Sequence, residues 1–441
     1  MNSNLGTIIY DNSFFESQLR NYSNNLKIGH LNLQSFALGG TSTKLDELRN
    51  VLSNNLFDVV GITETWLTEY ISSNSVYLPG YVICRNDRPG ITGGGVALYV
   101  SRSLKFNIIC RETKYKTNRR GDRSHVSAEF LFIEITVSGR KILVGVVYLP
   151  HGDLTSIEDS ITDVLTKYND IVIIGDFNNN MFDISRAVSV REMCSRLNMI
   201  CHHNSLPTHL SIRFGSTSLI DYFLISPSMN TIQSGQVQIP GTSRHSFIYA
   251  VFDVKIPMVK EFIEYFDFND VDYSLLEFIF NSCDFDRIFY TADVNEQANL
   301  LFLYLCQMHS AVPFKKRKVC RFSDDSWFNS PEIKNSLTIR NASYRLYLRK
   351  RSKENWNNFC RLRNRSKTII RNAKRKAHAT LFHDKNSEQI WNTLRANGIG
   401  DTVTNIDKVD VENLNSFFSS NQGSLEFSCH WERRTIWNKP L

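Results

Sequence analysis

The chain has 441 residues, 42% of them hydrophobic, which is long enough for two or three domains with sizeable cores. No apolar run approaches the roughly 18 residues that span a bilayer, and the Asn- and Ser-rich start lacks a signal-peptide profile. Nine scattered cysteines without a Cys-x-x-Cys pair argue against a disulfide scaffold or a zinc site. We therefore expect an intracellular protein, nuclear or cytoplasmic, with no membrane partner.

The net charge of +7 is concentrated in one stretch. From Lys315 to Lys376 there are 20 Lys and Arg against four acidic residues, a net +16, while the remainder holds 31 basic and 40 acidic residues. Such a density is typical of nucleic-acid contact, and the alternative of a solvated charged surface explains it less well. The segment Lys315–Lys318 also has the composition of a nuclear-import signal.

Residues 1–25 are expected to be disordered, and residues 26–255 predict one α/β domain. Val/Ile-rich runs that predict buried strands alternate there with helical patterns. The expected strands are 27–31, 58–63, 95–100, 129–137, 141–149, 171–175, 219–225 and 247–254. The expected helices are 44–54, 157–167 and 184–197, the last with Asp183 as its N-cap.

After Pro257 the pattern changes, and residues 256–398 predict a basic helical connector. Residues 332–383 lack Pro and Gly and predict long helices. An apolar stripe at a spacing of three or four favours packing over a binding surface; its positions are Trp356, Phe359, Arg363, Ile370, Ala373 and Ala377. The tail, residues 399–441, is expected to be poorly structured.

Several polar residues lie at the ends of predicted strands, where the ligand sites of α/β folds gather. They are Asn32, Glu64, Tyr148, Asp176 and Asn178. Each taken alone is also explained as a turn former, a helix cap or a helix start. Asp221 is different because it lies within an apolar strand, and a buried carboxylate needs a partner or a metal.

A second group, Cys201-His202-His203, has metal-ligating residue types. Adjacent residues of one segment rarely converge on one metal. We interpret it as a loop leading to Pro207.

The ordered set of polar segments resembles the endonuclease/exonuclease/phosphatase superfamily over residues 26–255. The segments are His30-Leu31-Asn32, Ile62-Thr63-Glu64-Thr65-Trp66-Leu67, Tyr148-Leu149-Pro150, Gly175-Asp176-Phe177-Asn178, Ser218-Leu219-Ile220-Asp221-Tyr222 and Ser243-Arg244-His245. The resemblance implies an α/β fold, a four-layer, DNase-I-like sandwich of two packed mixed β-sheets flanked by helices. A C-terminal helical region would follow it.

The resemblance also implies a metal centre and an oriented imidazole. Glu64 would bind Mg²⁺ or Mn²⁺ with Asn32 beside it, in keeping with the preference of hard cations for carboxylate oxygen. Asp221 would orient His245, because an Asp–His pair fixes the tautomer of the ring and favours its charged form.

Three further roles are implied for catalysis. Asp176 would orient or deprotonate the attacking water, Asn178 would hold the scissile phosphate, and Tyr148 would contact a phosphate oxygen. Metal and hydrogen-bond donors would together offset the charge that grows on the phosphate.

A narrower resemblance is to the endonuclease of non-LTR retrotransposons. It is carried by Glu64–Leu67, Leu78–Tyr81 and Gly93–Val100. Three later segments resemble the connector before the reverse transcriptase of such elements: Ser326–Asn329, Asn341–Arg345 and Ile390–Leu394. No Tyr-x-Asp-Asp-type segment follows before Leu441, so we interpret the chain as a truncated element or a partial gene model. The expected activity is Mg²⁺-dependent nicking of DNA, with RNA as an alternative partner for the basic helices.

The sequence departs from the family pattern next to His245. Arg244 stands where the family often has Asp, Ser246 where some relatives have Asp, and Gln34 where other branches have a metal-proximal Asp. Arg244 would either weaken metal binding or contact phosphate, and on the first interpretation Arg244→Asp should raise activity.

Two alternatives to the active nuclease remain. The first is a phosphatase of the same fold that acts on a small phosphoester. The second is a catalytically weakened remnant that binds nucleic acid through its basic helices.

Overall fold

The computed structural model describes residues 18–36, 42–52, 56–90, 93–117, 123–211, 216–257, 262–268, 270–318, 327–383, 387 and 389–391. Most of the expected N-terminal disorder (1–17) and all of the expected tail (399–441) lie outside these residues. Residues 18–25 differ from the expectation, because Leu19 is buried in the domain core beside the short 3-10 helix η1 (Arg20–Tyr22). Within the described part, no helix is both long and apolar enough to cross a membrane.

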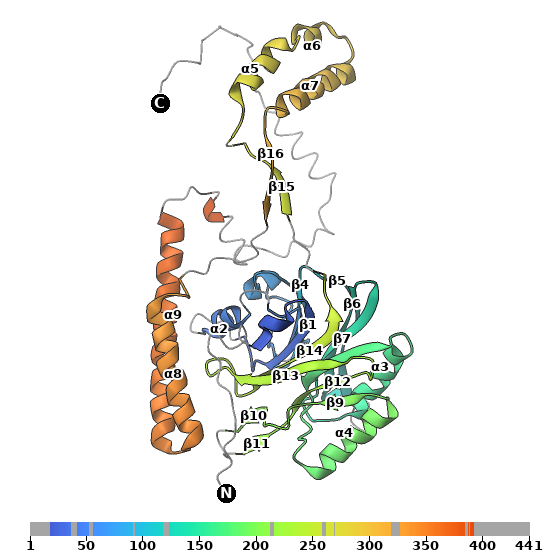
Figure 1. Cartoon of the computed structure of the whole chain (residues 1–441), viewed down its shortest axis with the longest axis vertical. Coiled ribbons are helices and arrows are strands. Elements are labelled where there is room, and N and C mark those ends of the chain that lie inside the picture. The colour runs from blue at the N-terminus through green and yellow to red at the C-terminus, as the bar shows by residue number, and fades with distance from the viewer. Residues whose placement is uncertain are drawn as a thin grey trace.

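The domain is built on two six-stranded mixed sheets (Figure 1). The first has the order β13-β14-β1-β2-β4-β3. Its strands are β1 (Asn25–Asn32), β2 (Val59–Thr63), β3 (Tyr81–Asn86), β4 (Val96–Ser101), β13 (Thr231–Gln238) and β14 (Ser246–Lys255). β1 runs parallel to β2 and antiparallel to β14.

The second sheet has the order β5-β6-β7-β8-β12-β9, with β7 parallel to β8 and β12 antiparallel to β8. Its strands are β5 (Lys105–Thr117), β6 (Arg123–Val137), β7 (Arg140–Tyr148), β8 (Asp170–Asp176), β9 (Ile200–His202) and β12 (Asp221–Ile225). A small hairpin, β10 (His209–Leu210) and β11 (Thr217–Ser218), lies beside the sheets.

Burial of apolar side chains joins four layers. Along β6, Leu131 and Ile133 pack between the sheets, whereas Phe130 and Phe132 pack on the opposite face against α3 (Thr155–Leu165). α4 (Ile184–Arg196) covers the same outer face, and α2 (Lys44–Val51), near the short 3-10 helix η3 (Ser73–Val76), covers the outer face of the first sheet. Each central strand is thus apolar on both faces, and the expected fold class, a DNase-I-like sandwich of two mixed sheets with flanking helices, is confirmed.

Every expected strand overlaps an observed one, but several strands carry no periodic signal. β5 is mostly polar and largely exposed, so nothing in its sequence marks it. Cys201 and His202 lie in the edge strand β9, not in the expected loop, because β9 pairs with β12. The helix that begins at Ile184 does have the expected cap, since Asp183 accepts a 3.2 Å hydrogen bond from the amide of Arg186.

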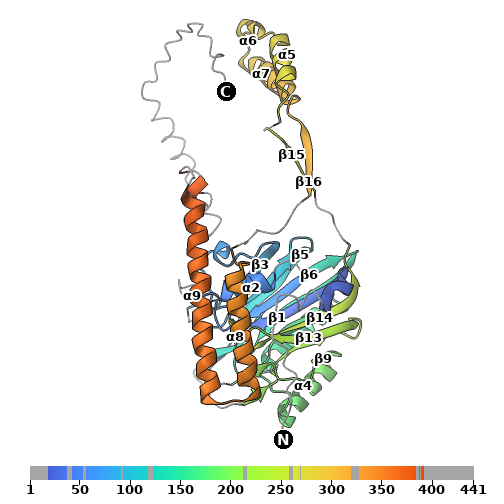
Figure 2. The ribbon, with the colours of Figure 1, turned by 60° about the vertical axis from the view of Figure 1, so that its left-hand side comes forward.

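The segment expected as a single connector forms two separate pieces. In the first, β15 (Phe262–Phe266) and β16 (Phe314–Lys318) pair and lead to the helices α5 (Tyr273–Ser282), α6 (Asp286–Tyr290) and α7 (Val294–His309), which project away from the sheets (Figure 1). In the second, α8 (Pro331–Arg349) and α9 (Lys353–His383) form a helical hairpin that lies along the domain (Figure 2).

The apolar stripe of the helical hairpin is packed, as expected. Phe359 packs with Tyr344 of α8 and with Leu210 of the domain, while Ile370 packs with Ile333. The burial of these side chains against α8 and against β10 is what holds α9 in place.

Candidate active site

The topology brings the ends of five strands to one edge of the sandwich. Because β1 and β2 are parallel, Asn32 pairs with Thr63, the residue before Glu64. In the second sheet Asp176 lies between Tyr148 on β7 and Asp221 on β12. Gly175, the residue before Asp176, lets the backbone of β7 pass close to β8, because a Cβ at Gly175 would lie 1.9 Å from the carbonyl oxygen of Val147.

Asn32 links two carboxylates from different sheets. Its Nδ2 donates to Oε1 of Glu64 and to Oδ2 of Asp176, both at 2.8 Å. Glu64 adopts a left-handed backbone conformation, with φ of 52°, and its second oxygen accepts from Nε1 of Trp66 at 3.3 Å. Asn32 is itself fixed, since its Oδ1 accepts from the amide of Gln34 at 3.0 Å.

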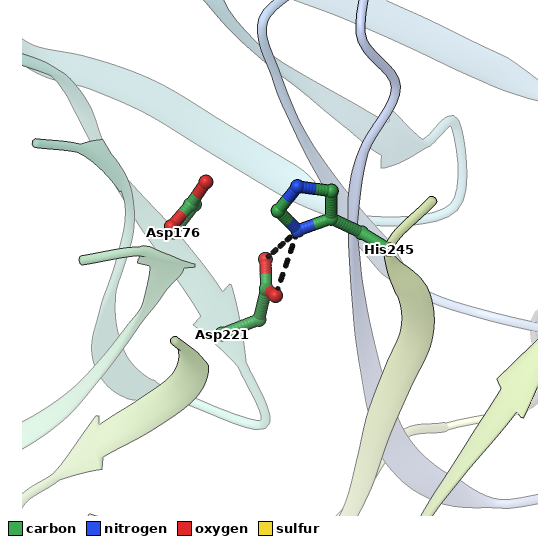
Figure 3. A group of neighbouring side chains, drawn as sticks. All are labelled: Asp176, Asp221 and His245. Carbon is green, nitrogen blue, oxygen red and sulfur yellow. Dashed lines mark hydrogen bonds and ion pairs between the residues drawn. The ribbon is translucent and has the colours of Figure 1, made fainter. Parts of the chain in front are cut away.

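Asp221 and His245 form a buried pair (Figure 3). Nδ1 of His245 lies 2.9 Å from Oδ2 of Asp221 and 3.2 Å from Oδ1. Burial acts to lower the pKa of His245, but the Asp221 carboxylate, with smaller contributions from the charges of Asp176 and Glu64, outweighs burial and raises this pKa to about 9. Burial acts to raise the pKa of Asp221, yet the charge of His245 holds it below its usual value. The imidazole is therefore held in its charged form at neutral pH.

Asp176 lies opposite this pair (Figure 3). Burial and the nearby charge of Asp221 raise the pKa of Asp176 to about 7, so its carboxyl exchanges a proton near neutrality. Its Oδ1 accepts from the backbone amide of Asn178 at 3.0 Å, and Nδ2 of Asn178 donates to the carbonyl of Leu149 at 2.9 Å. These contacts fix both side chains.

Tyr148 closes β7 beside Asp176. Burial raises the pKa of its hydroxyl, and the charges of Glu64 and Asp176 add to the effect. The phenol is therefore a neutral hydrogen-bond donor. All seven residues expected at the site are thus brought to this one edge.

His30 is a residue that the sequence reasoning gave no role. It is fully buried on β1, with Nδ1 3.8 Å from Oδ1 of Asp221 and Nε2 3.2 Å from the hydroxyl of Thr63. Burial lowers the pKa of His30 to about 4, so its ring is neutral. The segment His30-Leu31-Asn32 was one of those that carried the resemblance. His30 lies two positions before Asn32 on a strand, so both side chains share one face, and this spacing could have indicated that His30 lies near the site.

The residues that depart from the family pattern lie beside the pair. Arg244 is exposed, and its backbone amide contacts Oε1 of Gln34 at 3.4 Å. Ser246 begins β14 and accepts from Nε2 of Gln238 at 3.0 Å, so it belongs to the sheet.

The donor set fits a hard divalent cation. Glu64 and Asp176 offer carboxylate oxygens on either side of the Asn32 amide, and oxygen ligands are those that Mg²⁺ and Mn²⁺ prefer. Asp176, Asp221 and His245 also form a group whose potential ligand atoms lie within 4.8 Å of one another. Both oxygens of Asp221 already face His245, which favours the side of Glu64 for a metal.

Residues 29–245 match the model of the Endonuclease/Exonuclease/phosphatase family. This part, just under half of the chain, is similar to that family. The domain is therefore related to hydrolases of phosphoester bonds, which are typically metal-dependent. None of the curated proteins compared with the chain matches it.

Several solved structures of differently named proteins are similar to this domain. The endonuclease domain of TRAS1, a telomere-specific non-LTR retrotransposon, is 14% identical with a TM-score of 0.38 and covers 52% of this chain and 99% of its own. The catalytic domain of human Nocturnin is 18% identical (TM-score 0.40; 53% and 94%), and an AP endonuclease from Archaeoglobus fulgidus is 17% identical (0.38; 52% and 100%). At these values none of them specifies a substrate for this chain.

Proposed function

We propose that the chain is a divalent-metal-dependent endonuclease that nicks DNA by hydrolysing a phosphodiester bond, derived from a non-LTR retrotransposon. The observation that supports this best is the buried Asp221–His245 pair facing Asp176, whose carboxyl has a pKa near 7. A positioned base beside a charged donor suits attack by water on an anionic phosphate.

In this proposal Asp176 accepts the proton of the water whose oxygen attacks phosphorus. The P–O bond to the leaving strand breaks, and the leaving oxygen takes a proton from solvent. His245, kept charged by Asp221, stabilises the negative charge that grows on the phosphate oxygens. Asn178 and Tyr148 donate hydrogen bonds that hold the phosphate in line with the water. Mg²⁺ or Mn²⁺, held by Glu64 with Asn32 beside it, would supply further positive charge when bound.

DNA is preferred to a small phosphoester because of what lies next to the domain. The helical hairpin contributes most of the basic excess of the chain and packs directly on the family domain. A small phosphoester carries too few phosphates to contact such an extended basic surface, whereas the backbone of DNA carries many. The assignment to retrotransposons draws on the sequence segments Glu64–Leu67 and Gly93–Val100.

A supercoiled-plasmid nicking assay on the full chain tests the proposal. We expect nicked circles with Mg²⁺ or Mn²⁺, none with a chelator, and none with Asp176→Asn. Turnover of a soluble phosphomonoester without nicking would favour the phosphatase. DNA binding without any turnover would favour the weakened remnant.

A further inference from the structure

A groove of about 520 Å³ lies between the family domain and the helical hairpin. One wall carries Gln34, Lys44 and the 240–244 loop, and the other carries Trp356, Arg363 and Lys367. None of its lining residues is acidic. The groove therefore joins two parts of the chain that are far apart in sequence and presents only positive charge.

Three of its four cations keep donors free for a ligand. Among the residues that the structure describes, Arg244, Arg363 and Lys367 make no ion pair with an acidic side chain. Nε of Arg363 is buried without a hydrogen-bond partner, and one terminal nitrogen has only a 3.4 Å contact with Asn364. A buried guanidinium nitrogen without a partner is costly, so an acceptor from outside the chain is favoured here.

Lys44 contributes charge and shape. Its ammonium donates to the carbonyls of Leu33, Gln34 and Ser35 at 2.9, 2.7 and 3.1 Å, which fixes the loop after β1. Burial lowers its pKa to about 8, and the charges of Lys367 and Arg244 act in the same direction. Like charges are thus close enough to disfavour one another, and a bound anion would offset that repulsion.

The groove opens beside the active site. Arg244 directly precedes His245, and its amide contacts the side chain of Gln34, whose own amide donates to Asn32. If one phosphate of a nucleic-acid strand lies at Asp176 and His245, the neighbouring nucleotides of that strand would therefore lie in the groove.

The hairpin wall is held firmly. Arg340 of α8 forms a 2.8 Å ion pair with Glu47 of α2, and both side chains are almost fully buried. Lys374 of α9 pairs with Asp46 at 2.8 Å. Because the wall does not depend on the ligand for its position, the groove is formed before anything binds.

We propose that this groove binds the phosphodiester backbone of the nucleic-acid strand that enters the active site, with Arg244, Arg363 and Lys367 as phosphate ligands. The location of the cut beside it rests on the proposed function, but the binding does not. Donors on two facing walls, without an acidic residue between them, suit a run of phosphates along a strand.

The test is the affinity of the full chain for a fluorescein-labelled DNA duplex, measured by polarisation in a chelator at several salt concentrations. Arg363→Gln/Lys367→Gln is compared with Arg365→Gln/Lys376→Gln, which removes the same charge from exposed positions of α9 outside the groove. We expect the groove variant to bind about tenfold or more weakly, and its log–log salt slope to fall by about 1 for each phosphate that is no longer neutralised. The affinity of the control should fall by less than a third as much.

Equal losses of affinity in both variants, or a loss in the control alone, would overturn the proposal. Lys367→Gln alone is a second test, because Lys367 has no partner whose loss would unfold the hairpin. Arg363→Lys keeps the positive charge, so it should bind DNA more tightly than Arg363→Gln does. Binding is measured in a chelator, where a metal-dependent hydrolysis does not occur, so binding and nicking are tested separately. If the groove variant binds more weakly but the parent chain does not nick DNA with metal, only the proposed function is refuted. If the parent chain nicks DNA but the groove variant binds as tightly as the parent, only the groove proposal is refuted.

Discussion

His245 and Asp221 form a hydrogen-bonded ion pair that connects the two sheets of the domain. Asp221 begins β12 of the second sheet, His245 directly precedes β14 of the first, and Nδ1 lies 2.9 Å from Oδ2. Both side chains are buried. Packing of the sheets therefore sets the geometry of the pair. His245 needs the carboxylate of Asp221 to hold its ring charged and oriented.

Asp221→Asn and His245→Ala should each lower nicking by about a hundredfold or more, because either change removes the charged, oriented imidazole. The double variant should be little worse than either single one, since residues that act as a unit are not additive. Initial rates of plasmid nicking at saturating Mg²⁺ measure this. If the two losses multiply in the double variant, the residues act independently and the unit does not exist.

The charge of His245 should be visible in its titration. The pKa of His245 in the folded chain, about 9, lies above the ordinary value of 6.5. The contribution of its charged ring to the stability of the folded state is therefore fully present below pH 6.5 and is lost as the pH rises through 9. We expect NMR of the metal-free chain to show this ring titrating near 9, and in Asp221→Asn well below that. His30, whose pKa burial lowers to about 4, provides an internal control that should stay neutral above pH 6. A His245 titration that does not change in Asp221→Asn contradicts the ion pair.

Apolar runs in the sequence predicted buried strands of an α/β domain, and the resemblance carried by the ordered polar segments implied the sandwich of two sheets. Val/Ile-rich runs such as 171–175 predict buried strands, and Asp176 lies at the end of the strand that this run forms. Asp221 stood out since a carboxylate inside an apolar strand needs a partner. Its partner proved to be His245.

What the sequence could not show is how distant segments meet. β5 is polar and exposed, so its pairing with β6 leaves no periodic trace. The docking of α8 on α2 includes a buried pair, Arg340 with Glu47, whose members are nearly 300 positions apart. The groove beside Arg244 exists only because of that docking, and no local pattern predicts it.

Glu64→Gln should raise the metal concentration needed for nicking by about tenfold or more, because the amide removes the negative charge that a hard cation prefers. Asn32→Ala should have a related effect of about 10- to 100-fold, since Asn32 orients both carboxylates. A Mg²⁺ titration of nicking and calorimetry of Mn²⁺ binding measure both. Glu69→Gln, an exposed neighbour, is the matched control. Unchanged Mn²⁺ affinity in Glu64→Gln would move the metal to another site.

Arg340→Met should destabilise the docked hairpin by about 3–5 kcal/mol, because it leaves the carboxylate of Glu47 buried without its cation. Urea unfolding of the full chain measures the loss. Arg349→Met, exposed on the same helix, should change little. Glu47→Gln/Arg340→Met should recover part of the stability, since the uncompensated charge is gone. If the double variant is less stable than Arg340→Met, the Glu47 carboxylate is stabilised by contacts other than Arg340, such as the hydroxyl of Thr43 at 3.3 Å.

Arg244→Asp separates the two roles that the sequence left open for this position. The sequence alone favoured higher activity, on the view that an acidic residue near the metal is missing. The structure changes our expectation, because Arg244 lines a groove with Lys44 and Lys367 and no acidic residue. An Asp there would repel the phosphates of the strand, so we expect lower activity at every Mg²⁺ concentration and a higher KM, by about tenfold at low salt and less at high salt. Arg244→Lys should keep most activity, and Arg191→Asp, exposed on α4, controls for net charge. Nicking across a Mg²⁺ titration compares the three. Activity of Arg244→Asp equal to or above that of the parent would instead mean that Arg244 weakens the metal site, and the groove would then bind the strand without it.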